Sequence, residues 1–316
     1  MYLPIFPAGF ARENLVASQK LDHTTEHKFR IGSVPYLNAV PLTRGIEGEI
    51  FFATPAKLAE MLRRDELDAA LVSVTEVLLT GRYDILDGVA IASLGEVYSV
   101  LLAHRKPLAE AREIFCDTAS LTSVNLLKVL LAERGLKPEF KPLENYAAAA
   151  EKDFVLLIGD RAIEFQRAPH AHEVFDLGAA WLELTRLPFV YAVWALRRGI
   201  ENRELRHELK AAKHFGLETL DSIIETREEF DEDFRRDYFE WHIHFHLGED
   251  EKRAVAREPF LWLVTARPTR ALAGIATVRA PTTFHVVPSD DWLAVKVEPL
   301  RLRRSQVGTI TLGPAT

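Results

Sequence analysis

The chain has 316 residues, 48% of them hydrophobic and 27% charged, an ordinary soluble globular composition with room for two domains and a sizeable core. The formal net charge of −7 leaves no cationic surplus for phosphates and so excludes non-specific nucleic-acid binding. No segment reaches the ~18 uncharged apolar residues of a membrane span, residues 1–28 lack the pattern of a secretory signal, and Cys116 is the only cysteine, so we expect a cytoplasmic protein without disulfides.

The first part of the chain alternates short apolar runs with helical patterns, after a polar extension at residues 1–28. Thr54 and Pro55 are typical of the N-cap and first residue of a helix. Strands are expected at residues 29–34, 49–53 and 68–72, and helices at residues 57–64 and 73–76. This alternation indicates a parallel α/β sheet.

The same alternation continues through the middle of the chain and stops near residue 200. Further strands are expected at residues 89–93, 97–103, 114–116, 154–158, 174–177 and 188–196. Helices are expected at residues 124–134 and 179–184, and another follows Gly159-Asp160 and runs to Arg167. Charge-rich helices with apolar stripes are expected at residues 201–226, 231–246 and 249–264. Residues 268–316 lack a helix signal and are expected to form either a small β element or a weakly ordered tail.

The simplest architecture for this order is α/β with two lobes and a cleft between them, each lobe built on a parallel-rich sheet. The chain would cross between lobes near residues 97–102 and return near residues 187–193. Loops at the carboxyl ends of strands would face the cleft. The expected segments are an extension at 1–28, lobe 1 at 29–98 plus 190–266, lobe 2 at 99–189, and a C-terminal extension of unknown role at 267–316.

The first candidate site follows the first strand, in the sequence RIGSVPYLNAVPL at residues 30–42. A strand, a tight loop and a helix start would point free backbone N–H groups at whatever lies above the strand end. Asn38 is a good helix N-cap, but its amide can also position a substrate oxygen or polarise a leaving hydroxyl. The pattern leaves both interpretations open.

A second candidate is a hydroxyl-rich turn just before an expected helix, formed by Thr118, Ser120, Thr122 and Ser123. Hydroxyls and backbone N–H groups at a helix start suit a carboxylate or phosphate, although one such hydroxyl would also serve as an N-cap. Four hydroxyls exceed what capping needs, and this favours anion binding.

Weaker candidates follow other strands of the expected sheets. Ser73 and Thr75 follow a strand, and Ser99 is a polar residue inside the apolar run VYSVLL. Gly159 permits close backbone approach, and Asp160 beside it can cap a helix or orient a neighbour.

Several other kinds of site receive little support. His242 and His246 would share one face of a helix, but no HExxH or cysteine pattern completes a zinc set, so a partly buried helix is the favoured interpretation. The sequence has no GxGxxG, GxxxxGK[ST] or GxSxG motif, which removes the usual support for dinucleotide, P-loop or Ser/His/Asp sites. These negative results favour a cofactor-free enzyme or a pure binding protein.

Six motifs occur in an order that resembles the chorismate dehydratase family of the futalosine route to menaquinone. They are RIGSVPYLNAVPL (30–42), ATPAKLAEMLRRDELDAALVSVTE (53–76), VYSVLL (97–102), DTASLTSVNLL (117–127), LLIGDRAI (156–163) and DLGAAWLELTRLPFVYAVWAL (176–196). The resemblance implies a type II periplasmic-binding-protein-like fold without transport. It also implies loss of water from chorismate, a dianionic small-molecule substrate, to give 3-[(1-carboxyvinyl)oxy]benzoate without metal or organic cofactor.

The resemblance also implies roles for individual residues. Asn38 matches the Asn of the YLN motif and would work at the reacting C3/C4 edge of the substrate, and Ser99 would hydrogen-bond a substrate carboxylate. The hydroxyl-rich turn would hold the other carboxylate. Further substrate contacts are expected from the cleft-lining positions Ser73, Thr75, Gly159 and Asp160, besides Ser120, Thr122 and Ser123 of the turn.

Two positions depart from the family pattern. Leu121 stands where the turn usually carries Arg or a similar residue, and Arg186 replaces the Gly of TGLPF, where it would supply positive charge or lie in solvent. Two alternatives to the dehydratase are a non-catalytic small-carboxylate binding protein on the same fold and the sister 1,4-dihydroxy-6-naphthoate synthase. The first motif argues against the synthase. The sequence does not predict an oligomeric state.

Overall fold

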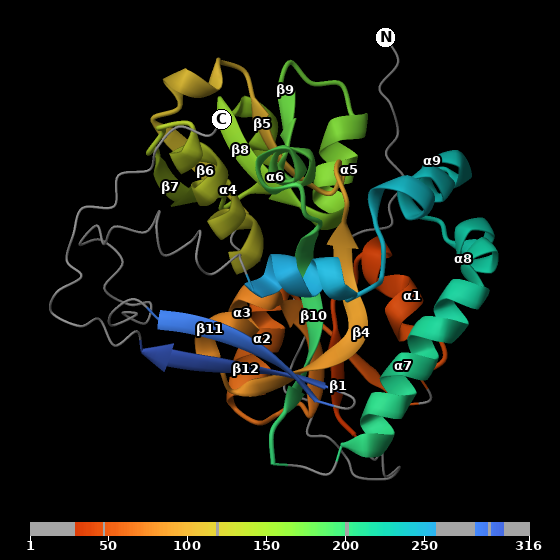
Figure 1. Cartoon of the computed structure of the whole chain (residues 1–316). Coiled ribbons are helices and arrows are strands. Elements are labelled where there is room, and N and C mark those ends of the chain that lie inside the picture. The colour runs from red at the N-terminus through yellow and green to blue at the C-terminus, as the bar shows by residue number, and fades with distance from the viewer. Residues whose placement is uncertain are drawn as a thin grey trace, which may run out of the picture.

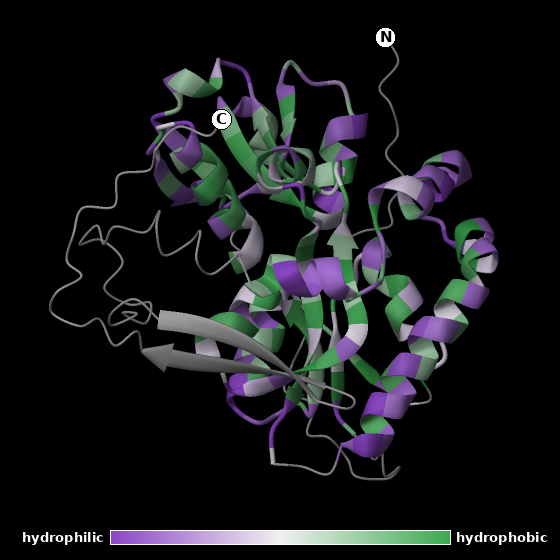
Figure 2. Ribbon diagram, in the orientation of Figure 1, coloured by the Kyte–Doolittle hydropathy of each residue, from purple (hydrophilic) through white to green (hydrophobic). Residues whose placement is uncertain are grey.

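The computed structural model describes residues 29–46, 48–117, 120–199 and 202–256, together with the backbone of 282–289 and 292–299. The predicted N-terminal extension and the rest of the C-terminal extension lie outside these residues. Two β-sheets with helices around them lie one above the other (Figure 1). Hydrophobic residues concentrate along the strands of both sheets, and hydrophilic residues lie on the outer turns of the helices (Figure 2).

The first sheet has seven strands in the order β11-β12-β4-β10-β3-β1-β2. Strand β1 pairs in parallel with β2 and β3, whereas β10 runs antiparallel to β3 and β4. The prediction of a parallel-rich sheet is therefore wrong for this lobe, because the chain returns into the sheet through β10 and most neighbouring strands run antiparallel. The strand bounds are β1 Ile31–Ser33, β2 Ile50–Phe52, β3 Ala69–Ser73, β4 Tyr83–Ser93, β10 Phe189–Arg197, β11 Thr282–Ser289 and β12 Trp292–Pro299.

The second sheet has five strands in the order β7-β6-β8-β5-β9. Strand β6 pairs in parallel with β7 and β8, and β5 runs antiparallel to β8 and β9. Every residue of β5 and β8 is buried, as their continuous apolar runs predict. The bounds are β5 Val100–His104, β6 Glu113–Cys116, β7 Glu139–Pro142, β8 Phe154–Ile158 and β9 Glu173–Asp176.

The chain passes from the first sheet to the second between β4 and β5, and returns between β9 and β10. The exact lobe boundaries at residues 98 and 190 stay a prediction. Helices cover both sheets, and their bounds are α1 Val40–Thr43, α2 Pro55–Arg63, α3 Val74–Thr80, α4 Leu121–Glu133, α5 Gly159–Arg167, α6 Leu177–Thr185, α7 Arg203–Glu218, α8 Leu220–Thr226 and α9 Glu232–Asp237. Shorter 3₁₀ turns are η1 Leu37–Ala39, η2 Leu108–Glu110 and η3 Tyr146–Glu151, and η4 Tyr238–His242 is a π-turn.

Helix α2 begins where its capping residues predict. The Thr54 hydroxyl accepts from the Lys57 N–H at 3.3 Å, and Pro55 takes the first helical position. Leu58 and Leu62 are fully buried on one face, against β1 and β3. Local sequence alone predicts this helix, because its capping residues and its buried apolar residues all lie within a few positions of one another.

The predicted helix over 231–246 is wrong in its second half. Helix α9 ends at Asp237, η4 follows, and His244 then forms an antiparallel bridge with Ala92. The reason lies in the spacing of Ile243, Phe245 and Leu247, which are buried at every second residue. A period of two forms extended chain, so His242 and His246 do not share a helix face.

Helix α6 ends in a conformation that suits glycine. Arg186 is its C-cap with φ 59°, in the left-handed region, and its side chain is exposed. A left-handed residue other than glycine costs about 1–2 kcal/mol. We therefore expect Arg186→Gly to raise the free energy of unfolding by about 0.5–1 kcal/mol, after the larger chain entropy of unfolded glycine is subtracted. Urea denaturation measures the change.

The control for this substitution is Arg64→Gly. Arg64 also caps a helix, α2, but its φ is −92°, which any residue adopts. Glycine should bring no relief there and should lower stability through chain entropy. Equal effects of the two substitutions would contradict the assignment of strain to Arg186.

Candidate functional site

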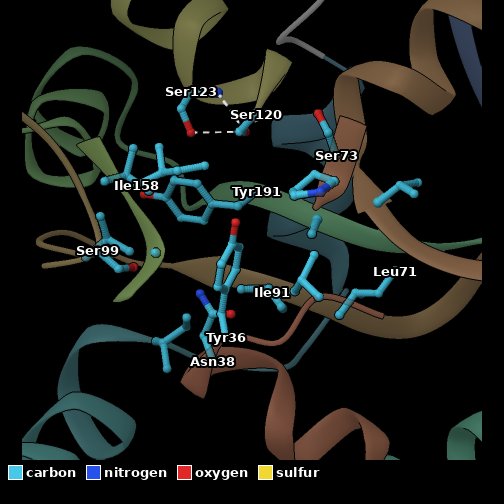
Figure 3. A pocket seen from close by; sticks show the side chains of 18 residues that line it. Tyr36, Asn38, Leu71, Ser73, Ile91, Ser99, Ser120, Ser123, Ile158 and Tyr191 are labelled. Carbon is cyan, nitrogen blue, oxygen red and sulfur yellow. Dashed lines mark hydrogen bonds between the residues drawn. The ribbon is translucent and has the colours of Figure 1, made fainter. Parts of the chain in front are cut away.

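A pocket lies between the two sheets, and Figure 3 shows side chains from both entering it. Its described lining contains no charged side chain. The polar side chains that line it are amides and hydroxyls, contributed by Tyr36, Asn38, Ser73, Ser99, Ser120, Ser123 and Tyr191. The pocket thus brings together the candidates Asn38, Ser73, Ser99, Ser120, Ser123 and Gly159, whereas Thr75, Thr122 and Asp160 do not line it.

Asn38 lies inside η1 rather than at a helix N-cap. Tyr36 precedes η1 and Ala39 precedes α1, and neither cap makes a side-chain hydrogen bond. The Oδ1 atom of Asn38 is buried and has no hydrogen-bond partner in the protein. A buried unpaired carbonyl oxygen costs free energy, and such atoms call for an explanation. The N-cap interpretation is therefore wrong, and the amide is available to a ligand.

The turn that carries Asn38 is held from across the pocket by Asp160, at the start of α5. The Leu37 N–H donates to the Asp160 carboxylate oxygens at 3.1 and 3.3 Å. Burial raises the pKa of Asp160 to about 6, against the opposing effect of the Leu37 hydrogen bond. Asp160 therefore connects the start of α5, next to the second sheet, with the turn of Asn38, which follows β1 of the first sheet.

We expect Asp160→Asn to raise the free energy of unfolding at ~pH 8 and to change it little at ~pH 4. The folded-state pKa lies above the unfolded value of ~3.9, so the folded protein binds the Asp160 proton more tightly. That contribution to stability is complete below ~pH 4 and is lost as pH rises through about 6. Asparagine remains neutral throughout and keeps an acceptor for Leu37. Urea denaturation across this pH range measures the difference.

The matched control is Asp68→Asn, for which the sign reverses. Burial alone would raise the pKa of Asp68, but hydrogen bonds and charge from Arg30, together with Arg197, hold it below its ordinary value. Asp68→Asn should therefore lower stability at ~pH 7 and lose this effect in acid. If both substitutions had the same pH dependence, the assignment of the raised pKa to Asp160 would be wrong.

Ser99 enters the pocket from the segment between β4 and β5. Tyr98 before it has φ 65°, an uncommon conformation for a bulky residue. The Asp176 carboxylate holds this segment by accepting from the N–H groups of Val97 at 3.1 Å and Tyr98 at 2.9 Å. The same carboxylate caps α6 by accepting from the Ala179 N–H at 2.9 Å. Burial raises the pKa of Asp176, against these hydrogen bonds. Sequence reasoning missed Asp176, although Asp before a helix is an N-cap signal.

The hydroxyl-rich turn forms the N-terminus of α4. The Ser120 hydroxyl caps the helix by accepting from the Ser123 N–H at 3.3 Å, and the Ser123 hydroxyl donates to it at 3.2 Å (Figure 3). Both side chains line the pocket and are buried. Thr118 lies outside the described residues. Hydroxyls and the positive end of a 13-residue helix together suit an anion.

Thr122 does not line the pocket, and its side chain links α4 to the end of β3. Its Oγ1 atom lies 3.0 Å from the Thr75 hydroxyl and accepts from the Thr75 N–H at 3.3 Å. It also hydrogen-bonds the Ser73 hydroxyl. Thr75 and Thr122 are fully buried. The hydroxyls of Thr75 and Thr122 therefore hold α4 against the end of β3, whereas Ser73, Ser120 and Ser123 line the pocket.

Two tyrosines of the lining were missed by sequence reasoning. Tyr36 extends into the pocket from the Asn38 side (Figure 3). Burial and, to a smaller extent, the negative charge of Asp117 raise the pKa of the Tyr36 phenol to about 12. A Cβ at Gly159 would lie 3.3 Å from the Tyr36 ring, and Gly159 has φ 59°. Tyr191 hydrogen-bonds the Ser93 hydroxyl at 3.0 Å. The position of Tyr36 two residues before Asn38, in the same loop, was a signal that could have indicated Tyr36 as a lining residue.

The two departures from the family pattern lie outside the pocket. Leu121 is exposed on the first turn of α4, and Arg186 is exposed at the end of α6. Neither lines the pocket. The idea that Arg186 supplies positive charge to the site is therefore wrong, and its interpretation as a solvent-exposed side chain is confirmed.

Two kinds of feature are absent from the part of the chain that the structure describes. Within it, no three His, Cys, Asp or Glu side chains gather closely enough to hold a metal ion. Within the same residues, no helix combines the length and apolar character needed to cross a bilayer.

Comparison with known proteins gives the family of the chain. The profile of a family described as menaquinone biosynthesis matches residues 29–257. Chorismate dehydratase from Thermus thermophilus is 34% identical over 253 residues, which cover 70% of this chain and 90% of that protein. The chain belongs to this menaquinone-biosynthesis family. Chorismate dehydratase from Campylobacter jejuni is 27% identical over 227 residues, which cover 70% of this chain and 88% of the Campylobacter protein.

Solved structures show the fold of this family member. A protein from Archaeoglobus fulgidus has a TM-score of 0.60 at 17% identity, with 75% of this chain and 97% of that one covered. The periplasmic aliphatic sulphonate binding protein from Escherichia coli has a TM-score of 0.51 at 14% identity, covering 80% and 96%. The predicted two-lobe, periplasmic-binding-protein-like fold is confirmed, as is the family resemblance drawn from the six motifs.

Proposed function

We propose that the protein is a chorismate dehydratase, which eliminates water from chorismate to give 3-[(1-carboxyvinyl)oxy]benzoate in the futalosine route to menaquinone. The observation that carries the proposal is the unpaired Asn38 Oδ1 in a pocket that is also lined by Ser99 and by the hydroxyl-rich N-terminus of α4. The named activity of the Thermus thermophilus and Campylobacter jejuni relatives supports it.

The chemistry of the reaction explains what such a pocket has to do. Chorismate is a dianion with a hydroxyl at ring C4 and a hydrogen at C3 that is acidic through the ring carboxylate. Loss of the C3 proton and of hydroxide from C4 forms an aromatic ring and one water. The reaction is redox-neutral overall, and we propose that it proceeds without a cofactor. The enzyme must bind two carboxylates and stabilise charge that spreads onto one of them.

The residues of the pocket take roles that follow from their positions. Ser120 and Ser123, with the free N–H groups of α4, would bind one carboxylate without a cationic side chain. Ser99 would hydrogen-bond the other carboxylate, and Asn38 would lie at the C3/C4 edge. The described lining includes no Asp, Glu, His or Lys. We therefore propose that a water molecule or a substrate carboxylate takes the C3 proton.

The test is incubation of the purified protein with chorismate and no added cofactor, followed by chromatography and mass spectrometry. Loss of one water with a new aromatic absorbance is the expected result. Chorismate recovered unchanged from folded protein would contradict the proposal and favour a non-catalytic carboxylate-binding protein. The predicted cytoplasmic location belongs to the same proposal and stays a prediction.

A further inference from the structure

Tyr238 is a buried residue behind the pocket that neither the sequence motifs nor the proposed roles include. It begins η4, far along the chain from Asn38 and Ser99, and it is 0% exposed. Its phenol donates a hydrogen bond to the Ser99 Oγ at 2.8 Å. Because a phenol carries one proton, that proton is committed to Ser99.

The Asn38 side chain also acts on the Tyr238 phenol and lowers its pKa, against the larger effect of burial. A lowered phenol pKa requires a donor, and only the NH₂ group of an asparagine donates, so we infer that the amide nitrogen of Asn38 faces Tyr238. The other amide atom, Oδ1, has no protein partner. Asn38 and Ser99 both line the pocket (Figure 3), whereas Tyr238, which donates to Ser99, does not line it.

These contacts leave Ser99 able to donate a hydrogen bond into the pocket and Asn38 able to accept one. Ser99 accepts from Tyr238 and keeps its own hydroxyl proton to donate. Asn38 presents a carbonyl oxygen, which can only accept. Burial raises the pKa of the Tyr238 phenol, so it remains a protonated donor near neutral pH.

We propose that Tyr238 is a positioning residue that fixes Ser99 as a hydrogen-bond donor and Asn38 as a hydrogen-bond acceptor toward the substrate. The inference rests on the proposed elimination for its kinetic consequence. A donor at Ser99 suits a carboxylate oxygen, and an acceptor at Asn38 suits the C4 hydroxyl or a water molecule. Without the phenol, both side chains are free to rotate, and the pocket loses this fixed pattern.

The first experiment compares Tyr238→Phe with wild type in the chorismate assay. The Phe ring keeps the stacking of Tyr238 on Phe234, whose centroid lies 5.7 Å away, and removes one hydroxyl. We expect kcat to fall about 10- to 100-fold with KM changed less than about 3-fold, because alignment rather than binding is lost. Tyr83→Phe is the control, since Tyr83 is 1% exposed and its hydroxyl has no partner and lies outside the pocket lining.

A double-variant comparison distinguishes action through Ser99 from a merely structural role of Tyr238. In a structural role, the effect of Tyr238→Phe on kcat would be the same with and without the Ser99 hydroxyl. If the phenol acts through Ser99, Tyr238→Phe should reduce kcat much less in a Ser99→Ala background than in wild type. Additive losses in the double variant would overturn the proposal. So would a kcat for Tyr238→Phe within about 2-fold of wild type.

A second measurement does not depend on turnover. The chain has five asparagines, so selective ¹⁵N-Asn labelling gives few side-chain amide signals, and the Asn38 signal is the one absent from Asn38→Ala. We expect it to shift in Tyr238→Phe and to stay in place in Tyr83→Phe. An unmoved signal overturns the proposal. If wild type fails to convert chorismate, the proposed function fails, and this signal alone decides whether Tyr238 orients Asn38.

Discussion

Replacing Asn38 with alanine is expected to lower kcat for chorismate about 10²- to 10³-fold while the protein stays folded. The Asn38 Oδ1 is buried and unpaired in the free protein, so its cost of desolvation is already met before substrate arrives. A preorganised dipole at the reacting edge contributes more to the transition state than to substrate binding, so KM should change less than kcat. Steady-state kinetics on chorismate measure both constants.

The matched control for this substitution is Asn145→Ala. Asn145 lies on the surface, where its Oδ1 accepts from the Ala147 N–H at 2.9 Å at the start of η3. Its loss should cost about 1 kcal/mol of stability and leave kcat unchanged. Wild-type turnover by a folded Asn38→Ala variant would exclude Asn38 from the chemistry and leave the buried oxygen without a catalytic role.

Elements whose signals are contiguous in sequence were predicted correctly. Thr54 and Pro55 mark the start of α2, and Ser120 caps α4 as the hydroxyl-rich turn predicts. The helix over 231–246 failed because a charged amphipathic pattern was extended across Ile243, whose neighbours alternate with period two. The N-cap interpretation of Asn38 failed for a different reason, because η1 begins one residue before Asn38 and uses no side-chain cap.

The site itself was predicted only in its lining. Asn38, Ser99, Ser120 and Ser123 belong to recognisable motifs and converge on the pocket. The contacts that orient them join residues far apart in sequence, 139 positions for Tyr238 with Ser99 and 123 for Asp160 with Leu37. No local pattern marks such a partner, because its identity depends on tertiary packing. That is why Tyr238 was missed and why Asp160 was expected among the lining residues, to which it does not belong.

Replacing Gly216 with alanine is expected to lower the free energy of unfolding by about 3 kcal/mol. Gly216 lies inside α7, where helix propensity alone predicts that alanine would stabilise by about 1 kcal/mol. However, a Cβ at this position would lie 1.9 Å from the Pro41 carbonyl oxygen and 2.6 Å from its carbon. Backbone atoms cannot turn aside as a side chain does, so α7 must separate from α1. Urea denaturation therefore tests the sign as well as the size.

The consequence reaches the pocket because α1 follows directly on η1, which carries Asn38. Gly216→Ala should therefore lower kcat together with stability, although Gly216 does not line the pocket. Gly248→Ala is the control, since its nearest contact is the flexible Glu251 carboxylate at 3.0 Å, and it should change stability by less than about 1 kcal/mol. A stabilised Gly216→Ala variant would show that the contact between α7 and Pro41 yields easily, and that close packing there does not hold the Asn38 turn in place.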